Sequence, residues 1–553
     1  MPSSSATSSP GKPAPARWLW LAYSGLALLI LGPLLRPGYV LTLDMVFTPR
    51  LRLAAVTDNT YLFSALLRLF NVVLPGDVIQ RLILAGTFVA AGSGMHLLAR
   101  RLAIAEIGAY VAGVLYVLNP FTYDRLMAGQ YEVLLGYALL PWAVRSLLAF
   151  LERPAGCSAA LLAVWSMAIS IVSIHTFGMV VLLAAIGSVL GLWRYHQQTG
   201  YRQLLLRYGL TATALVTIVS AYWLLPLVLG KGSAAAAVAR FGAGDREAFA
   251  TVGSGIVGRL GNIVRLQGFW AETHGLYTLP QAGDRAWGLL ALLMWAVIGC
   301  GAARLWRRGN RQRFAAVLLG ASSIVAIFLA AGALDGWLAA HVPLFAGYRE
   351  PEKFVAIVAL TFAVCAGAGA TAIVHYCQSQ QWRWAPPVAA GLLLLVPIVY
   401  TPTMLWGAQG QLAAVSYPAD WAMANQRLNA EHGTFQTLFL PWHLYMYFGF
   451  AGRIVANPAP LFFDTPIIAS NNPELGDAQP STGGAIQQSV TRLLRPAAPD
   501  PSFAARLAAL HIKYILLAKE DDYHRYLYLN SQPGIRLISS SATLALYRNE
   551  ALQ

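Results

Sequence analysis

The sequence predicts an α-helical polytopic membrane protein, with about eleven spans and a C-terminal α/β domain outside the cytoplasm. Two observations support this prediction. Of the 553 residues, 57% are hydrophobic and only 11% are charged, whereas soluble domains carry about 25% charged residues. The apolar residues also gather in runs of the length that a membrane span needs, about 20 residues. The bilayer is therefore the expected solvent for most of the chain.

The apolar runs give the expected number of crossings. We place spans near residues 17–35, 78–98, 103–120, 131–150, 157–174, 176–193, 208–230, 286–304, 313–333, 354–376 and 385–402. The preceding residues, 1–16, are rich in Ser, Pro and Ala, and we expect a disordered cytoplasmic tail. No small-residue cleavage site follows the first run, which indicates a retained anchor instead of a cleaved signal peptide.

Charge asymmetry orients these spans. With the N-terminus inside, every inside loop is basic, as the positive-inside rule requires. The basic residues of these loops are Arg100, Arg101, Arg153, Arg194, Arg202, Arg207, Arg304, Arg307, Arg308, Arg311, Arg313 and Arg383. An odd number of spans then places the C-terminal segment outside. The clusters also explain the net charge of +15, which without a basic fold motif does not indicate nucleic-acid binding.

Cysteine placement and missing motifs exclude other classes. None of Cys157, Cys300, Cys365 and Cys377 lies in a segment expected outside the membrane, so no exported disulfide is predicted. The sequence has no Walker loop, dinucleotide fingerprint, zinc spacing or HExxH motif. A soluble nucleotide or metal enzyme is therefore disfavoured. No clear metal site is predicted, and a need for a divalent cation is left open.

From residue 403 onward no run is long and apolar enough to span. The pattern predicts an amphipathic helix at 420–432, a strand at 435–440, a helix at 503–510, and strands at 513–517 and 544–547. The stretch 457–501 is rich in Pro, Asn and Gly and is expected to be largely loop. We therefore predict a multi-span membrane domain over 17–402 and an extracytoplasmic α/β domain over 403–553.

Three expected outside loops are longer than connectors need to be, and long loops are usually functional. They cover 36–77, 231–285 and 335–353. Within the first loop, an apolar stretch at 61–74 has helical spacing but is too short to span. We expect this stretch to lie at the membrane interface.

Asp44 is the first candidate catalytic residue, because it stands in an otherwise apolar part of the first loop. A carboxylate near the outer membrane face is costly to bury unless it is paired or used. One interpretation is a general base that takes a proton from an acceptor hydroxyl as its oxygen attacks a sugar carbon. The alternative is a solvated loop residue or a helix cap.

A second group stands at the start of the tenth expected span and comprises Arg349, Glu350, Glu352 and Lys353. Arg349 and Lys353 could bind the phosphate of a lipid-linked donor, and Arg does so through a bidentate fork. Glu350 could pair with Arg349 or act as a second carboxylate. The alternative is interfacial anchoring by charged side chains that reach toward water.

Two further groups are candidates for substrate contacts. Tyr123, Arg125, Gln130 and Glu132 surround the start of the fourth expected span, where polar side chains usually face a cavity or the bundle interior. Trp270 and His274, in the second long loop, combine an aromatic face with a hydrogen-bonding group, as sugar binding requires. Helix capping and interfacial anchoring by Tyr are the alternatives for the first group, and placement at the membrane interface is the alternative for the second. His175 could carry a proton, although a lone interfacial His is more often structural.

An Asp in the first outside loop, an odd number of spans and an exported C-terminal domain together resemble the GT-C superfamily of integral membrane glycosyltransferases. Short segments are similar to the arabinofuranosyltransferase D type and to YfhO-like membrane proteins. These segments are Asn119-Pro120-Phe121, Gly129-Gln130, Gly136-Tyr137, Leu140-Pro141-Trp142 and Tyr348-Arg349-Glu350-Pro351-Glu352-Lys353-Phe354. The C-terminal domain matches more loosely, through Leu440-Pro441-Trp442 and Lys513-Tyr514-Ile515-Leu516.

The resemblance implies a polyprenyl-phosphate-linked sugar donor and transfer to a cell-envelope glycan or lipid acceptor on the outer face of a prokaryotic cytoplasmic membrane. Asp44 matches the catalytic Asp that the family carries in its first loop. Our hypothesis is that Asp44 is the base, that Arg349 and Lys353 hold the donor phosphate, and that Glu350 orients them. Many members follow the Asp with a second acid, whereas Met45 follows it here, which bears against a metal-assisted mechanism. The alternatives are a transporter or flippase of a lipid-linked envelope component, and a non-catalytic scaffold with a GT-C-like fold.

Overall fold

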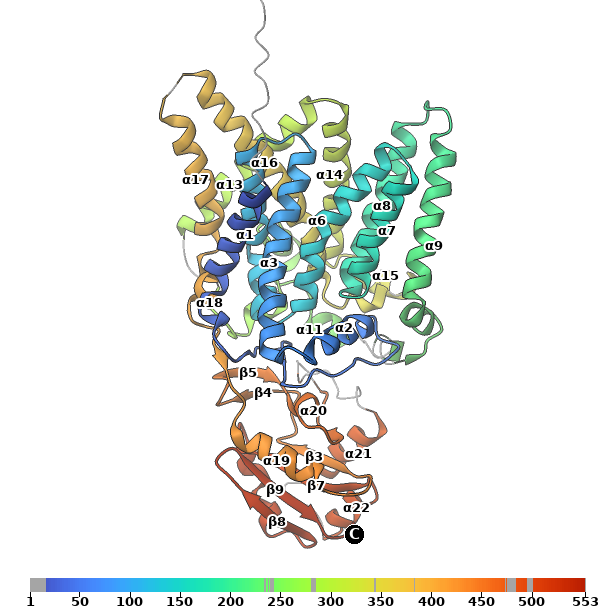
Figure 1. Ribbon diagram of the computed structural model, residues 1–553, viewed down its shortest axis with the longest axis vertical. Coiled ribbons are helices and arrows are strands. Elements are labelled where there is room, and N and C mark those ends of the chain that lie inside the picture. Colours follow the sequence, from blue (N-terminus) through green and yellow to red (C-terminus); the bar gives the residue numbers. More distant parts are fainter. Residues whose placement is uncertain are drawn as a thin grey trace, which may run out of the picture.

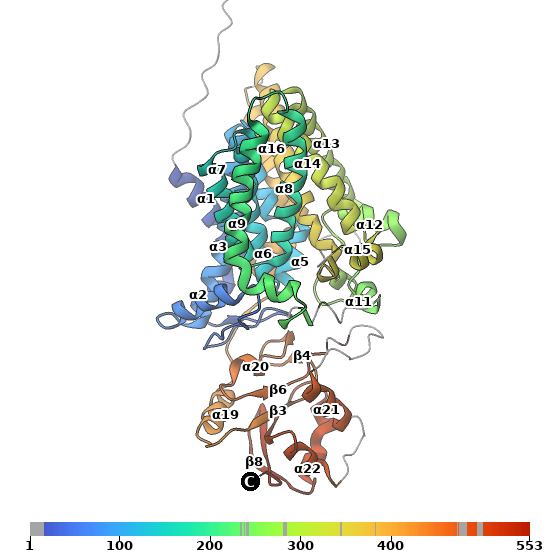
Figure 2. The ribbon, with the colours of Figure 1, turned by 90° about the vertical axis from the view of Figure 1, so that its right-hand side faces the viewer.

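The computed structural model describes residues 16–552 except 233–234, 237, 239–242, 280–284, 343–344, 382, 473, 475–483 and 495–500. Of the predicted tail over 1–16, all but Ala16 lies outside the described residues. A bundle of upright helices forms the larger part of the molecule, and a smaller part with β-sheets lies at one end of the bundle (Figures 1 and 2).

The long apolar helices of the bundle are α1 (Ala16–Leu31), α3 (Gly76–Arg101), α6 (Tyr131–Glu152), α8 (Ile174–Arg194), α9 (Tyr201–Val228), α13 (Arg285–Arg307), α14 (Asn310–Ala330) and α16 (Val355–Ser379). Within the described residues, 8 helices are long and apolar enough to cross a membrane. The number is 9 if α17 (Ala385–Tyr400) and the residues up to Gln409 form one span bent by 72°. The chain is therefore a helical multi-pass membrane protein.

Two predicted spans are shorter than expected, so length and composition do not confirm a count of about eleven. The segment 103–120 contains α4 (Glu106–Val117), with 12 residues, and 157–174 contains α7 (Gly156–Ser170), with 15 residues. At about 1.5 Å per residue such helices do not reach across a hydrocarbon core of about 30 Å. Helix α4 ends just before Asn119, which caps the helix that follows. The Asn119 side chain accepts a hydrogen bond from the Thr122 N–H of that helix.

Both short helices nevertheless pack among the long ones. Helix α4 contacts α3 and α16, and α7 contacts α6, α8 and α9, beside which it stands upright (Figure 1). Helix α16 is the central helix and contacts α4, α13, α14 and α17. A Cβ atom on Gly367 of α16 would lie 2.4 Å from the Gly108 carbonyl oxygen of α4. Glycine thus allows these two helices the close approach that is common in membrane bundles.

The long loops contain short helices at the end of the bundle that faces the smaller part. Helix α2 (Tyr61–Asn71) lies across this end in both views (Figures 1 and 2). It buries Phe63 and Leu67 and exposes Leu66 and Leu69. The other loop helices are α11 (Ala243–Ala248), α12 (Gly255–Ile263), η2 (Trp270–Thr273), α15 (Asp335–His341), η3 (Phe345–Gly347) and η4 (Pro351–Phe354).

The C-terminal part, which we call the C-terminal domain (residues 414–552), is built on a five-stranded sheet with the order β6-β3-β7-β9-β8. These strands are β6 (Ile467–Ile468), β3 (Gln436–Leu440), β7 (Ile512–Ala518), β9 (Leu544–Asn549) and β8 (Ile535–Ser540). Strand β3 runs parallel to β6 and β7, whereas β9 is antiparallel to β7 and β8. The helices are α19 (Ala419–Asn429), α20 (Ala459–Phe462), α21 (Ala485–Leu494), α22 (Phe503–Ala508) and η6 (Tyr523–Asn530).

The predicted elements of this domain correspond to α19, β3, α22, β7 and β9. The stretch 457–501 was expected to be largely loop, but its described part also contains α20, β6 and α21. Helix α21 buries Val490 and Leu493 against the sheet side of the domain. A spacing of three residues places these two side chains on one face of the helix. Packing of this face stabilises the helix, although the composition of the surrounding stretch favours loop.

The first loop joins the bundle to the C-terminal domain. Strand β1 (Tyr39–Val40) pairs antiparallel with β2 (Ala414–Val415). Beyond β1, the Leu43 N–H donates to the Ile454 carbonyl at 3.1 Å, and the Ala456 N–H donates to the Leu43 carbonyl at 2.8 Å. The first loop therefore adds a third chain segment to the two-stranded ribbon of β4 (Tyr445–Phe448) and β5 (Arg453–Ala456).

Candidate active site

A tight turn holds Asp44 between the bundle and the C-terminal domain. Thr42 and Met45 exchange backbone hydrogen bonds of 3.3 and 2.7 Å across this turn. On the bundle side, the Asp44 N–H donates to the Ala128 carbonyl at 3.1 Å. The next residue, Gly129, has a φ of +72°, and a Cβ there would lie 2.2 Å from the Thr42 carbonyl oxygen. Glycine is therefore required where the turn meets the bundle.

The Asp44 carboxylate is solvent accessible, yet protein groups surround it on several sides. The Tyr445 hydroxyl donates to Oδ1 at 2.5 Å, and the Gln130 amide lies 3.4 Å from Oδ2. Partial removal from water raises the pKa of Asp44 above its usual value, and the charge of Glu350 adds to the rise. The hydrogen bonds from Tyr445 and Gln130 and the charge of Arg349 oppose it. A carboxyl in this state is suited to accept a proton.

Arg125 is the centre of a buried ion cluster next to Asp44. It lies on α5 (Pro120–Met127) and has no exposed surface. Its guanidinium donates to Gln130 Oε1 at 2.6 Å and to Glu350 Oε2 at 2.9 Å, and it also pairs with Glu352. The guanidinium carbon lies 4.3 Å from the centroid of the Phe269 ring. A buried Arg is tolerated because carboxylates and an aromatic face replace its water.

Glu350 connects this cluster to Lys353 and His175. The Lys353 amine lies 3.4 Å from Glu350 Oε2 and 3.5 Å from His175 Nε2. The Tyr348 hydroxyl donates to the His175 carbonyl at 2.7 Å. Burial alone would raise the pKa of Glu350, but the charges of Lys353, Arg125 and Arg349 outweigh it and hold that pKa well below its usual value. Glu350 is therefore ionised.

Arg349 lies between the ion cluster and the second long loop. It interacts electrostatically with both Asp44 and Glu350. Its guanidinium carbon lies 4.3 Å from the centroid of Phe249, whose ring meets the Trp270 ring edge-on at 5.1 Å. His274 continues this row, with its ring 5.4 Å from that of Trp270. A cation and three aromatic or hydrogen-bonding side chains thus form one row beside Asp44.

The structure brings five of the predicted site residues into one hydrogen-bonded network, namely Asp44, Arg125, Gln130, Glu350 and Lys353. Arg349 and Glu132 interact electrostatically with Asp44. Trp270 and His274 reach the network through Phe249 and Arg349. Tyr123 points elsewhere, because its hydroxyl donates to the Thr278 carbonyl at 2.6 Å and accepts from Gln411 at 3.0 Å.

Tyr445 is the main residue that the sequence did not reveal. It is separated from Asp44 by 401 residues and comes from the C-terminal domain. Asp124 was also missed as a titrating group. Its Oδ1 accepts from the Tyr277 hydroxyl at 3.1 Å, and burial together with nearby Glu272 raises its pKa well above the usual value. The only signal for it in the sequence was its place beside Arg125 in the polar segment 119–125.

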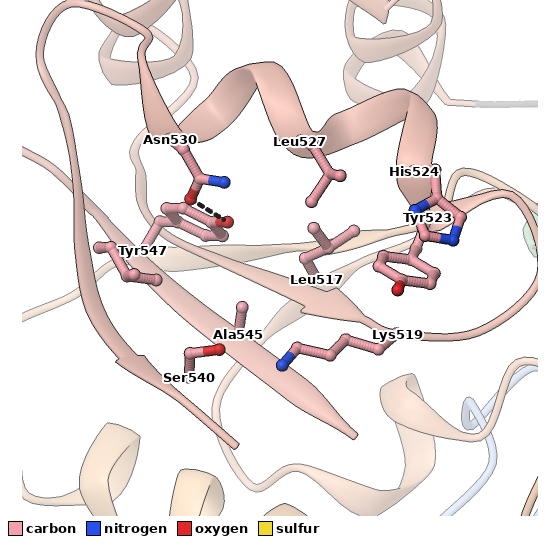
Figure 3. Close-up of a pocket in the computed structure, with 10 residues that line it drawn as sticks. Leu517, Lys519, Tyr523, His524, Leu527, Asn530, Ser540, Ala545 and Tyr547 are labelled. Atoms are coloured by element: carbon pink, nitrogen blue, oxygen red, sulfur yellow. Dashed lines mark hydrogen bonds between the residues drawn. The ribbon is translucent and has the colours of Figure 1, made fainter. Parts of the chain in front are cut away.

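Among the residues that the structure describes, no group of three or more His, Cys, Asp or Glu side chains could hold a metal ion. A separate hollow of about 320 Å³ lies in the C-terminal domain (Figure 3). Its lining residues are Leu517, Lys519, Tyr523, His524, Leu527, Asn530, Leu537, Ser540, Ala545 and Tyr547. Lys519 already donates to the Ser541 carbonyl at 2.5 Å, and Tyr547 to Asn530 at 3.0 Å. The Lys519 amine and the Tyr547 hydroxyl therefore already have hydrogen-bond partners within the domain.

Comparison with solved structures finds membrane proteins of similar fold. The cryo-EM structure of arabinofuranosyltransferase AftD from Mycobacteria is similar, with a TM-score of 0.65 and 17% identity over 97% of this chain and 40% of that chain. Two structures of a mutant of AftD match with TM-scores of 0.63 and 0.62. A looser likeness, with a TM-score of 0.47 and 11% identity over 98% of this chain and 100% of that chain, is to ArnT from Cupriavidus metallidurans bound to undecaprenyl phosphate.

The likeness to AftD bears out the resemblance to the arabinofuranosyltransferase D type that the short segments indicated. At 17% identity the likeness concerns the fold. The chain spans 40% to 42% of the length of the AftD structures. No protein-family model and no curated protein matches the chain.

Proposed function

We propose that the chain is a glycosyltransferase that moves a sugar from a polyprenyl-phosphate donor to a cell-envelope glycan or lipid acceptor. The reaction takes place on the outer face of a prokaryotic cytoplasmic membrane, with 17–402 in the bilayer and 403–553 outside it. One observation carries the proposal: the accessible carboxylate of Asp44 stands beside a buried ion cluster and Arg349, where the bundle meets the C-terminal domain. The fold of AftD, an arabinofuranosyltransferase, supports the same class of reaction.

In the proposed reaction Asp44 is the general base. An acceptor hydroxyl attacks the anomeric carbon of the sugar and its proton passes to Asp44 Oδ2. The new bond joins the acceptor oxygen to that carbon, and the bond from the carbon to the phosphate oxygen breaks. The electron pair of the broken bond leaves with the polyprenyl phosphate. A base in this position contributes about 10²–10⁴ to the rate, and a single displacement inverts the anomeric centre.

The leaving phosphate gains negative charge, which nearby cations stabilise. Arg349 takes this role most directly, because it is only half-buried and acts electrostatically on Asp44. Lys353 is buried against Glu350 and adds positive charge behind it. Glu350 keeps Arg125 and Lys353 in place. Trp270 and His274, in the row that begins at Arg349, present an aromatic face and a ring nitrogen to the sugar.

Gln130 and Glu132 complete the proposed site on the bundle side. Gln130 connects Arg125 to Asp44, and Glu132 acts on Asp44 through its charge. Tyr123 supports the neighbouring loop through Thr278 and Gln411. A transporter or flippase would need ionisable groups deep within spans. Of the three nearest candidates, Arg81 and His96 lie near the two ends of α3, where they pair with Asp77 and Glu106, and Arg145 lies within α6.

Transfer by the purified protein tests the proposal. Labelled sugar on a polyprenyl-phosphate donor is incubated with an envelope acceptor fraction, and label in the acceptor is counted. The wild-type chain should transfer label, and Asp44→Asn should lose at least about 100-fold of the rate because the base is removed. Asp521→Asn, the same change at an exposed carboxyl of the C-terminal domain, is the matched control. Full activity in Asp44→Asn would remove Asp44 from the mechanism, and transport of label without transfer would support the flippase.

A further inference from the structure

The two carboxylate oxygens of Asp44 are held unequally. Oδ1 accepts a hydrogen bond of 2.5 Å from the Tyr445 hydroxyl. Oδ2 has a distant donor, the Gln130 amide at 3.4 Å, and that amide lies closer to Glu350 Oε2, at 3.2 Å. One oxygen is therefore fixed by the C-terminal domain, while the other keeps capacity for a new donor.

The backbone that carries Tyr445 also fixes the backbone of Asp44. In the β4–β5 ribbon Tyr445 stands opposite Ala456. The Ala456 N–H donates to the carbonyl of Leu43, the residue before Asp44, and Leu43 donates in turn to Ile454. The ribbon thus holds both the main chain next to Asp44 and one of its carboxylate oxygens. Rotation of the carboxylate would break the short bond to Tyr445, so its orientation is determined.

We infer that Tyr445 is a positioning residue, supplied by the C-terminal domain, that orients the Asp44 carboxylate so that Oδ2 receives the acceptor hydroxyl. This inference rests on the proposed function. The C-terminal domain then does more than bind an acceptor, since it completes the catalytic base. Without Tyr445 the carboxylate rotates about its last side-chain bond and Oδ2 faces the reacting hydroxyl for only part of the time.

The groups around Asp44 determine in which direction its pKa should change when Tyr445 is substituted. Glu350 faces Asp44 as a carboxylate, Glu132 as a further acidic side chain, Arg349 as a cation, and Tyr445 and Gln130 as neutral donors. The Tyr445 hydroxyl stabilises the ionised form of Asp44. Removing this hydroxyl leaves the other groups unchanged, so the pKa of Asp44 rises further.

Tyr445→Phe removes the hydroxyl and keeps the ring. We expect the acid limb of the transfer rate to move up by about one pH unit, as a hydrogen bond to a charged group predicts. The maximal rate should fall about tenfold, with the KM for the donor unchanged, because positioning and not donor binding is lost. Tyr447→Phe is the matched control, since Tyr447 lies on the same strand and is 49% exposed. It should leave both rate and pH profile unchanged.

A second measurement does not depend on transfer. Dicyclohexylcarbodiimide modifies protonated carboxyls, and mass spectrometry of the Asp44 peptide at a series of pH values gives the midpoint of its titration. Tyr445→Phe should raise this midpoint and Tyr447→Phe should not. An unchanged midpoint in folded Tyr445→Phe protein overturns the inference, even if the wild-type chain transfers sugar. A raised midpoint in a chain that transfers no sugar supports the contact and refutes the proposed function instead.

Discussion

Substitution of Arg125 tests whether the ion cluster beside Asp44 holds the fold together. Arg125 is 0% exposed, and its partners Glu350 and Glu352 are 3% and 1% exposed. Arg125→Leu leaves both carboxylates without the guanidinium. Lys353, 3.4 Å from Glu350, still compensates one of them. Glu352 is more affected, because within the described residues its other oxygen, Oε1, has no hydrogen-bond partner.

Breaking a buried pair by removing one partner costs about 3–5 kcal/mol. Because Lys353 still compensates the charge of Glu350, we expect Arg125→Leu to lower the free energy of unfolding by about 3 kcal/mol, the lower end of this range. Chemical unfolding of the full chain in detergent, followed by tryptophan fluorescence, measures this loss. Arg50→Leu is the control, since Arg50 pairs with Asp464 at 2.8 Å but its side chain is 79% exposed. An exposed pair should cost about 1 kcal/mol or less.

The double variant Arg125→Leu with Glu352→Leu should recover part of the loss, because it removes the orphaned charge together with its partner. Equal destabilisation by Arg125→Leu and Arg50→Leu would refute the argument from burial. A double variant less stable than Arg125→Leu alone would show that Glu352 has other stabilising contacts.

Three further predictions concern the base, its turn and the C-terminal domain. The transfer rate should fall as the pH drops through the raised pKa of Asp44, because the protonated carboxyl no longer acts as a base. This fall should begin at a pH above the usual range of carboxyl pKa values, and a constant rate down to about pH 4 would exclude Asp44 as the base. Gly129→Ala should reduce the transfer rate at least about tenfold, because the new Cβ displaces the turn that carries Asp44. Gly200→Ala is the control and should not reduce the rate, since Gly200 has a similar φ but open space around it. His443 has a pKa raised to about 9, first by its hydrogen bond with Glu474. Its stabilising effect is complete below about pH 6.5 and is lost as the pH rises through about 9, so His443→Gln should lower the melting temperature at pH 6 and not at pH 10.

Local patterns in the sequence predicted what depends on local structure. The apolar runs gave the long helices, and the charged segment at 349–353 gave three members of the ion cluster, because η4 presents them within a few residues. The lengths of α4 and α7 were overestimated, because a hydrophobic run does not show where a capping residue such as Asn119 interrupts the helix. Helix α21 was not predicted, because the composition of its stretch favours loop, whereas burial of Val490 and Leu493 stabilises a helix there.

Contacts between distant segments could not be predicted in the same way. Tyr445 belongs to a short ribbon with no chemical motif, and it meets Asp44 only because the first loop joins that ribbon. The row from Arg349 to Trp270 depends on Phe249, an ordinary aromatic residue in a loop. Such contacts follow from tertiary packing, which one sequence does not reveal.

The bond between Asp44 and Tyr445 also has a consequence for biogenesis. The first loop leaves the ribosome early, whereas its partner follows 401 residues later. At about 5–20 residues per second, translation alone delays the meeting of the two by about 20–80 seconds. During that time the candidate site of the nascent chain is incomplete. Competence for the proposed chemistry would therefore arise only after the ribbon that carries Tyr445 has folded, so a chain terminated before this ribbon would be inactive.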